Sequence, residues 1–185
     1  ACAREEHWPW AEALIAGMAA EGIEPNVVAC GAMLSACARA KRWDSALHLL
    51  SEVERPDVMA FSSAVSACGR GGQWRHALQL VDDMRRQRVM PNSITYHAAI
   101  SACRQGRSWQ QVLQMLSRME TDGVRLDMET YRAAIGTFES AGPWPWALQL
   151  MEVMQESRYS PDRLVLSSAL AACDRGGSRE QALKV

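Results

Sequence analysis

Cysteine and histidine are the residue types in this chain that could bind a metal or attack a substrate. The 185 residues include six cysteines and four histidines, but no Cys-x-x-Cys pair with the spacing of a zinc site. Cys37, Cys68, Cys103 and Cys173 instead follow one another at intervals of 31, 35 and 70 residues. His97 lies six residues before Cys103, a separation that does not place two side chains on one helical face. We therefore interpret the cysteines as packing residues and expect no metal site and no catalytic thiol.

Other catalytic patterns and membrane segments are also missing from the sequence. It contains no Gly-rich phosphate loop, no paired carboxylates and no Ser-His-Asp order, so we expect no enzyme activity and no cofactor in this stretch. No apolar run approaches the ~18–20 residues of a membrane span. The 20 Lys and Arg against 21 Asp and Glu give a net charge of −1, which argues against non-specific attraction to nucleic acid.

Tryptophan, with seven copies against three tyrosines and two phenylalanines, could provide base-stacking surfaces. Five of the tryptophans, however, are spaced by 35, 31, 35 and 35 residues: Trp8, Trp43, Trp74, Trp109 and Trp144. Prolines share this period: Pro25, Pro56, Pro91 and Pro161. Cysteine, tryptophan and proline with one spacing predict an internal repeat. We place a partial repeat at 1–26, a short repeat at 27–57, further repeats at 58–92, 93–127 and 128–162, and a partial repeat at 163–185, all in one domain.

Each repeat has the pattern of two helices. Counting from the first residue of a repeat, apolar residues fall at positions 4, 7, 8 and 11, one stripe of an α-helix; in 58–92 they are Phe61, Ala64, Val65 and Cys68. A Gly-rich break and the Trp follow, and then a second stripe: Ala77, Leu80, Val81 and Met84. A closing Pro and Asn or Asp predict a helix stop and a cap for the next helix. The fold predicted is all-α, an α-solenoid (superhelix) of stacked two-helix hairpins of about 35 residues.

Most of the conspicuous side chains are explained by packing within such a stack. We expect the periodic Trp to cover the groove between one repeat and the next, and Trp10 and Trp146 to lie at the surface. Tyr96 and Tyr131 fall on the core stripe, as does Phe138, which replaces the periodic Cys. The methionines at position 27 predict a soft apolar core: Met18, Met84, Met119 and Met154.

The opposite side of the first helix remains, with positions 2, 5, 9, 12 and 13. Position 5 varies, position 9 is small, and position 13 is often Arg. Stacked first helices would align these positions in rows. The pattern alone leaves two alternatives: a solvated face, or a surface along which a ligand lies with one element per repeat.

The repeats resemble those of the pentatricopeptide repeat family over essentially all 185 residues. The resemblance rests on residues 94–96 and 98–103 of the first helix, on Gly106, on Met84 and on the closing Pro91-Asn92. The tetratricopeptide repeat, a protein-binding hairpin, fits less well because its Leu-Gly-x-x-Tyr signature is missing. A protein-binding scaffold without RNA stays the alternative.

The resemblance implies sequence-specific binding of single-stranded RNA, about one base per repeat. Position 5 and the last residue of the repeat would read the base; carried over, these residues are Gly31 with Asp57, Ser62 with Asn92, His97 with Asp127, Arg132 with Asp162, and Ser167. Position 2 would sandwich the base, through Val28, Met59, Ile94, Glu129 and Leu164. Position 13 would contact phosphate, through Arg39, Arg70 and Arg175.

The chemistry of each pair indicates a base. Asp accepts hydrogen bonds only and favours G or U, whereas Asn also donates and suits A or C. The family's rule assigns adenine to Ser62 with Asn92. His97 and Arg132 are unusual at position 5 and indicate only a weak preference for G or U. Glu129, at the sandwich position, would repel phosphate.

The expected ligand is a tract of about four to five nucleotides, bound weakly and with a shallow salt dependence. Family resemblance implies a mitochondrial or plastid factor in RNA editing, processing, stability or translation. We expect a monomer, with possible protein partners and no membrane. Because the chain begins and ends within helical patterns, we also expect it to be a piece of a longer protein.

Overall fold

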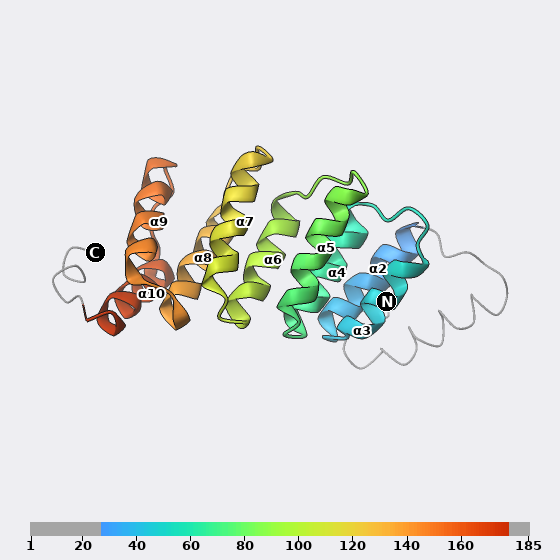
Figure 1. Ribbon diagram of the computed structural model, residues 1–185, viewed down its shortest axis with the longest axis horizontal. Helices are drawn as coiled ribbons and strands as arrows, with labels where there is room; N and C mark the ends of the chain where they lie inside the picture. The colour runs from blue at the N-terminus through green and yellow to red at the C-terminus, as the bar shows by residue number, and fades with distance from the viewer. Residues whose placement is uncertain (1–26, 178–185) are drawn as a thin grey trace. The chain divides into compact units, whose positions relative to one another are not determined.

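The computed structural model of the protein describes residues 27–177. Predictions that concern residues 1–26 and 178–185, including Trp8, Trp10 and Met18, lie outside this range. Within it there are nine helices and no strand (Figure 1). The helices are α2 (Val27–Arg39), α3 (Trp43–Glu52), α4 (Val58–Arg70), α5 (Trp74–Arg86), α6 (Ser93–Gln105), α7 (Trp109–Thr121), α8 (Met128–Ala141), α9 (Trp144–Glu156) and α10 (Arg163–Arg175).

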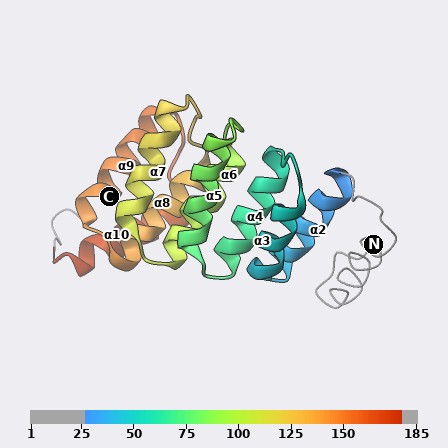
Figure 2. The same cartoon turned by 45° about the vertical axis from the view of Figure 1, so that its right-hand side comes forward.

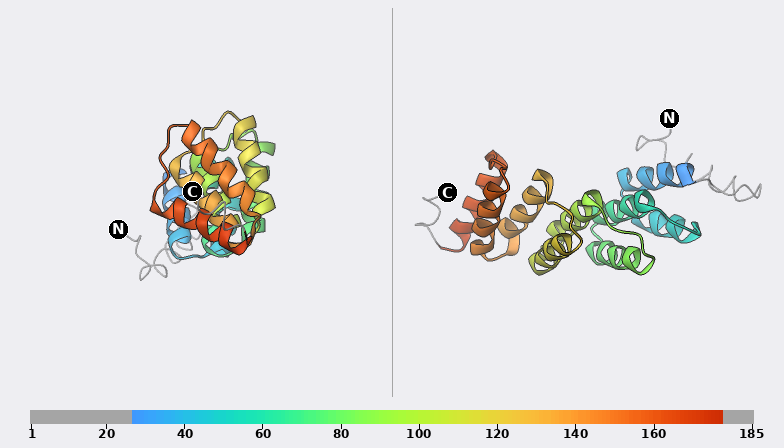
Figure 3. Two further views of the ribbon diagram at one scale, coloured as in Figure 1. Left: turned by 90° about the vertical axis from the view of Figure 1, so that its left-hand side faces the viewer. Right: turned by 90° about the horizontal axis from the view of Figure 1, so that it is seen from above.

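The chain divides into two compact units, Ala1–Ala102 and Cys103–Val185, and the division falls within α6. In the first unit, α2 packs against α3 and α4, and α4 packs against α5 (Figure 2). In the second unit, α8 packs against α7, α9 and α10, and α9 lies beside α10 (Figure 3). Successive hairpins therefore stack within each unit, which confirms the predicted all-α solenoid class. The repeat boundaries and the single domain stay predictions.

The apolar stripes form the core. In the first helix α4, Phe61, Ala64, Val65 and Cys68 are each at most 1% exposed, and the same positions of α6 are fully buried. The second-helix stripe is buried as well, in α5, α7 and α9. Five cysteines of the described range are buried thiols, and Phe138 is buried at the position that four of them occupy in other repeats. Packing, as predicted, accounts for the cysteines.

Helices α2, α4, α5, α6, α7 and α9 end with the same backbone motif, whereas α3 and α8 end in extended backbone at Val53 and Gly142. The carbonyls of Cys37, Cys68 and Cys103 accept hydrogen bonds from the amides five residues later. The carbonyls of Met84, Met119 and Met154 do the same at the ends of the second helices. This is the pattern of the Schellman motif, which requires one residue with positive φ.

The residue with positive φ is not always the expected glycine. Gly72 and Gly177 supply it as predicted, with φ of 75° and 72°. Beside Gly106, however, Arg107 adopts it with φ of 51°. The other non-glycine residues with positive φ in the described range are also cations: Lys41, Arg88 and Arg158. A cation at a helix C-terminus interacts favourably with the helix dipole, which offsets part of the backbone strain.

The periodic tryptophans pack against the next repeat. A Cβ atom added to Gly71 would lie 2.6 Å from Cδ1 of Trp43, and one added to Gly176 would lie 2.1 Å from Cδ1 of Trp144. Trp43 also stacks on His76, with ring centroids 5.5 Å apart. These contacts confirm the packing role for Trp43 and Trp144. Trp146 is 40% exposed, as predicted for a surface residue.

Candidate functional site

The last residue of each repeat caps the first helix of the next repeat. In every case Oδ1 of that side chain accepts a hydrogen bond from the backbone amide three residues later. The amide donors lie 2.8 Å from Asp57, 3.0 Å from Asn92, 2.8 Å from Asp127 and 2.9 Å from Asp162. The sequence predicted these caps from residue type alone, and the structure confirms them.

The cap fixes which atom of the side chain can face a ligand. Once Oδ1 is committed to the helix, the atom that remains is Oδ2 of an Asp or Nδ2 of an Asn. Asn92 therefore presents a donor, and Asp57 and Asp127 present an acceptor. Asn and Asp at this position therefore differ in one respect: the side-chain atom that the cap does not use is a hydrogen-bond donor in Asn and an acceptor in Asp.

Thr95 joins the two members of the pair Ser62 and Asn92. Its Oγ1 lies 2.7 Å from Oγ of Ser62 and donates to Oδ1 of Asn92 at 3.0 Å. Oγ of Ser62 also lies 2.7 Å from the carbonyl oxygen of Val58, and its single hydrogen can be donated to that oxygen or to Oγ1 of Thr95, but not to both at once. Ser62 is only 4% exposed and Thr95 is fully buried, so the serine predicted on the open face of the helix is covered by the next first helix.

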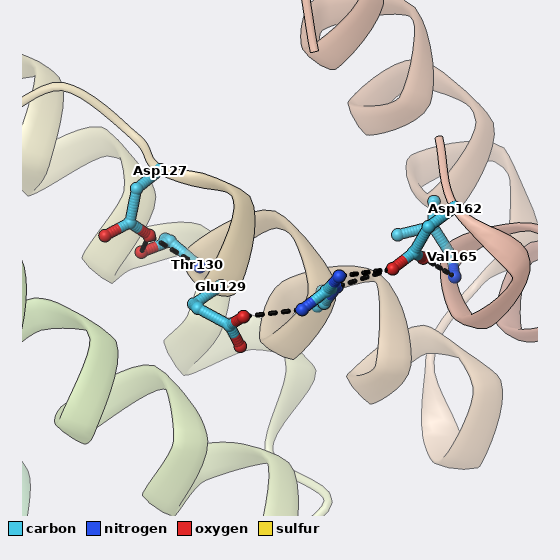
Figure 4. A network of polar contacts seen from close by, with 6 residues as sticks. Asp127, Glu129, Thr130, Asp162 and Val165 are labelled. Atoms are coloured by element: carbon cyan, nitrogen blue, oxygen red, sulfur yellow. Dashed lines mark hydrogen bonds and ion pairs between the residues drawn. The ribbon is translucent and has the colours of Figure 1, made fainter. Parts of the chain in front are cut away.

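Arg132 lies between two carboxylates (Figure 4). Its Nε donates to Oδ2 of Asp162 at 2.8 Å, its Nη2 contacts the same oxygen, and its Nη1 donates to Oε1 of Glu129. The predicted base-reading pair of this repeat is thus an ion pair, joined by the residue predicted to sandwich the base. The hydrogen bond from the amide of Val165, together with Arg132, lowers the pKa of Asp162. The hydrogen bond to Asp162 raises the pKa of Arg132.

Position 2 is exposed and apolar in three of the described first helices. Met59, Ile94 and Leu164 are 58%, 56% and 65% exposed, far more than the core residues on the same helices. Exposed apolar side chains at one recurring position indicate a contact surface. Glu129 occupies this position in α8 and is also exposed. Val28 lies in α2 at the equivalent place.

The cations of position 13 lie at the C-terminal ends of first helices. Arg39, Arg70 and Arg175 are exposed, and Arg175 also donates to the carbonyl of Phe138 at 3.3 Å. Arg104, one position earlier in its repeat, was not predicted as a site residue from the sequence. Its guanidinium lies over Gly136, where an added Cβ would be 3.0 Å from Cζ. The small residue at position 9 therefore makes room for a cation in this repeat.

The other predicted site residues have less defined surroundings. Gly31 lies in α2 with no atom within 4 Å of an added Cβ, and Ser167 is exposed on α10. His97 belongs to the first unit and Asp127 to the second. His97 is half-buried. Oδ1 of Asp127 also accepts a hydrogen bond from the hydroxyl of Thr130 at 2.7 Å.

Neither a metal-binding cluster nor a membrane-spanning helix is present in residues 27–177. No group of three or more His, Cys, Asp or Glu side chains in residues 27–177 could hold a metal ion. None of the helices described is both long and apolar enough to cross a bilayer.

Three family models match overlapping parts of the chain. The "Pentatricopeptide repeat domain" matches residues 13–70, the "PPR repeat family" residues 56–105 and the "PPR repeat" residues 94–124. The chain belongs to the pentatricopeptide repeat family. The resemblance stated from the sequence is thereby confirmed. No match was found among curated proteins.

Solved pentatricopeptide structures share the fold. PPR10 in complex with an 18-nt psaJ RNA element is 27% identical, with a TM-score of 0.78 over 96% of this chain. A second structure, of PPR10 from maize, is 28% identical, with a TM-score of 0.77 over 96% of this chain. The chain spans 27% of the first of these proteins and 26% of the second.

A more distant structure supports the fold alone. The PPR domain of Arabidopsis thaliana protein-only RNase P 1, in complex with tRNA, is 17% identical, with a TM-score of 0.70. The match covers 82% of each chain. Pentatricopeptide repeats therefore occur in that enzyme's domain structure as well as in PPR10.

Proposed function

We propose that the chain binds single-stranded RNA in a sequence-specific manner, with about one base per repeat. The observation that carries the proposal is the pairing of an exposed apolar residue with a fixed polar atom at the start of a first helix. In the first unit these are Ile94, 56% exposed, and the amide of Asn92 two residues earlier. A base needs an apolar contact for its face and a polar partner for its edge. The RNA complex of PPR10 supports the same ligand class.

Asn92 is the base-reading residue of repeat 58–92 in this proposal. Its Oδ1 is committed to the cap and to Thr95, so Nδ2 faces the base as a donor. The ring nitrogens on the pairing edges of A and C accept hydrogen bonds, whereas those of G and U carry a proton. Ser62 acts through Thr95 by holding the amide in this orientation. The family's rule selects adenine from the two bases that fit.

The repeats that end in Asp would recognise bases with the opposite hydrogen-bonding polarity. Asp57 and Asp127 offer an oxygen to a base that carries a ring N–H, which is G or U. Phosphates would lie near the exposed cations Arg39, Arg70 and Arg175. The family further supports a role in organellar RNA editing, processing, stability or translation, in a mitochondrion or plastid. Any catalytic step would belong to a domain outside this stretch.

The test uses short single-stranded RNAs that differ only at the base facing repeat 58–92. We expect A to bind about tenfold more tightly than G, a difference typical of one well-placed base contact. Asn92→Asp keeps the cap and replaces the donor with an acceptor, so it should shift the preference from A toward G. Equal affinity for all four bases would show that the assigned register is wrong.

Asn92→Ser is the matched control. Serine is also a good helix cap, so this variant should fold as the parent does but lack the amide nitrogen. It should bind RNA with little preference at this base. If the chain binds no RNA and a pull-down recovers a peptide partner instead, the protein-scaffold alternative is correct.

A further inference from the structure

The ion pair in repeat 128–162 occupies the atoms that would read a base. Asp162 uses Oδ1 for the amide of Val165 and Oδ2 for Nε and Nη2 of Arg132. In the repeat 58–92, by contrast, the second polar atom of Asn92 is not committed to the cap. At the last position of the repeat, the second polar atom of the side chain is therefore occupied in repeat 128–162 and not committed to the cap in repeat 58–92.

The guanidinium is occupied as fully as the carboxylate. Its three nitrogens all face carboxylate oxygens, two nitrogens toward Asp162 and Nη1 toward Glu129 (Figure 4). A single cation shared by two anions leaves this cluster with a net charge of −1. A base edge that approached it would have to displace charge-assisted hydrogen bonds, which are stronger than the neutral ones a base can offer.

The sandwich position of this repeat is also altered. Met59, Ile94 and Leu164 are exposed apolar residues, whereas Glu129 is drawn into the ion pair instead. An anionic side chain offers no apolar face to a base and repels the neighbouring phosphates. Both determinants of base contact are therefore lost in one repeat, and the same arginine is involved in both.

We infer that Arg132 is a specificity-determining residue that makes repeat 128–162 indifferent to the base it faces, by locking Asp162 and Glu129 into an ion pair. This inference rests on the proposed RNA-binding function. It replaces the weak lean to G or U that residue types alone indicate. The repeat then acts as a spacer between the bases read on either side.

The test compares RNAs that differ only at the base facing 128–162. We expect the parent chain to bind the four bases with dissociation constants within about twofold of one another. Arg132→Ser removes the lock and leaves Oδ2 of Asp162 as an acceptor, with a short hydroxyl at position 5. This variant should bind G at least fivefold more tightly than A or C. Arg132→Gln should also gain discrimination, because glutamine forms no ion pair.

Two control variants separate the lock from a general change of charge. Arg163→Ser removes an exposed cation next to Asp162 but leaves all three contacts of Arg132 intact, so it should change affinity equally for every base. Glu129→Gln keeps the contact between Arg132 and Asp162, so the repeat should remain indifferent. Circular dichroism of each variant checks that the helices are retained.

The outcomes distinguish this inference from the proposed function. A parent chain that discriminates by more than fivefold at 128–162, while still preferring A at 58–92, overturns the lock alone. Arg132→Ser and Arg132→Gln variants that fold but stay indifferent also overturn it. Failure to bind RNA, or to discriminate at 58–92, would instead overturn the proposed function on which the inference rests.

Discussion

The final side chain of a repeat has two partners at once. Oδ1 of Asn92 or Asp162 caps the helix that follows, and the other polar atom is not used by the cap; in Asp162 it meets Arg132. In the proposed function, recognition and capping would be carried by different atoms of one residue. An Asn-to-Asp exchange is therefore expected to alter recognition without altering the cap. Alanine is a poor probe here, because it removes both roles.

Thr95 provides the first test at the residue scale. Thr95→Val keeps the shape and the capping amide but removes the hydroxyl between Ser62 and Asn92. Both partners retain one other hydrogen bond, so we expect a loss of about 1 kcal/mol in the free energy of unfolding. The preference for A at repeat 58–92 should fall as well, since Asn92 is no longer oriented. Urea unfolding and the RNA series measure the two effects.

Thr130 offers the matched comparison. Within the described part of the second unit, its hydroxyl donates to Oδ1 of Asp127 and has no serine partner. Thr130→Val should therefore cost similar stability but leave the preference at 58–92 unchanged. An unaltered preference for A in Thr95→Val would contradict the positioning role.

The core thiols give a pH dependence. Burial raises the pKa of Cys68 to about 11, from an ordinary value of 9.0. Between pH 9 and 11 the unfolded chain loses this proton while the folded chain keeps it, so stability falls as pH rises. We expect a loss of about 2 kcal/mol across this window from Cys68. Urea unfolding at several pH values measures it, and Cys68→Ala should flatten the slope.

At the scale of the elements, the turn between the two helices depends on a tryptophan from the preceding repeat. Gly71 has a φ of −81°, which any residue adopts, so its backbone does not require glycine. The requirement comes from Trp43, which lies against it. Gly72, by contrast, needs its positive φ of 75°. Two adjacent glycines are therefore present for different physical reasons.

Gly71→Ala tests the contact with Trp43. The added methyl would lie 2.6 Å from the indole, so the ring or the turn must shift. We expect a loss of about 1–3 kcal/mol in unfolding free energy, as for other overpacked sites. Gly31→Ala is the control, because its methyl meets no atom within 4 Å and alanine favours a helix. If both variants are equally stable, the tryptophan does not restrict this turn.

Much of the fold follows from the sequence, because the repeat presents each feature several times. The apolar stripes that include Phe61 and Met84 recur at fixed positions of the repeat, and so do the capping residues. The repeat period and the helical spacing of apolar residues are therefore enough to predict them. The Thr95 bridge does not recur: the equivalent residues are Ala60, Thr130 and Val165. The lock around Arg132 joins side chains of two helices, and a residue type does not reveal which of several charges it contacts. Features that occur in a single repeat could be identified only from the structure.

At the scale of the whole molecule, the net charge of −1 argues against diffuse attraction to RNA and is compatible with binding through a few placed cations. Three cations at position 13 predict a slope of about −2 for the logarithm of the binding constant against the logarithm of salt concentration. Arg70→Gln should weaken binding equally for all bases and reduce the slope by about 0.7. Fluorescence anisotropy titrations at several salt concentrations measure both.

The control for this prediction is Arg86→Gln. Arg86 is also exposed, but it lies at the end of the second helix α5 and pairs with Asp83 at 2.9 Å. Its removal should leave the salt slope unchanged. A slope steeper than about −4, or equal effects of the two variants, would indicate diffuse electrostatic binding instead of a row of phosphate contacts.

The cap at the end of each repeat has a consequence for how such proteins can be recombined. A block exchanged as residues 58–92 carries Asn92 to the start of whatever helix follows it, where residue 95 of the recipient decides how the amide is oriented. Under the proposed function, specificity would be inherited partly from the neighbour on the C-terminal side. Modules cut three residues later, after Thr95, would keep the base-reading residue, the cap and its hydrogen-bonding support together. The unit best suited to exchange would then be offset from the unit defined by sequence periodicity.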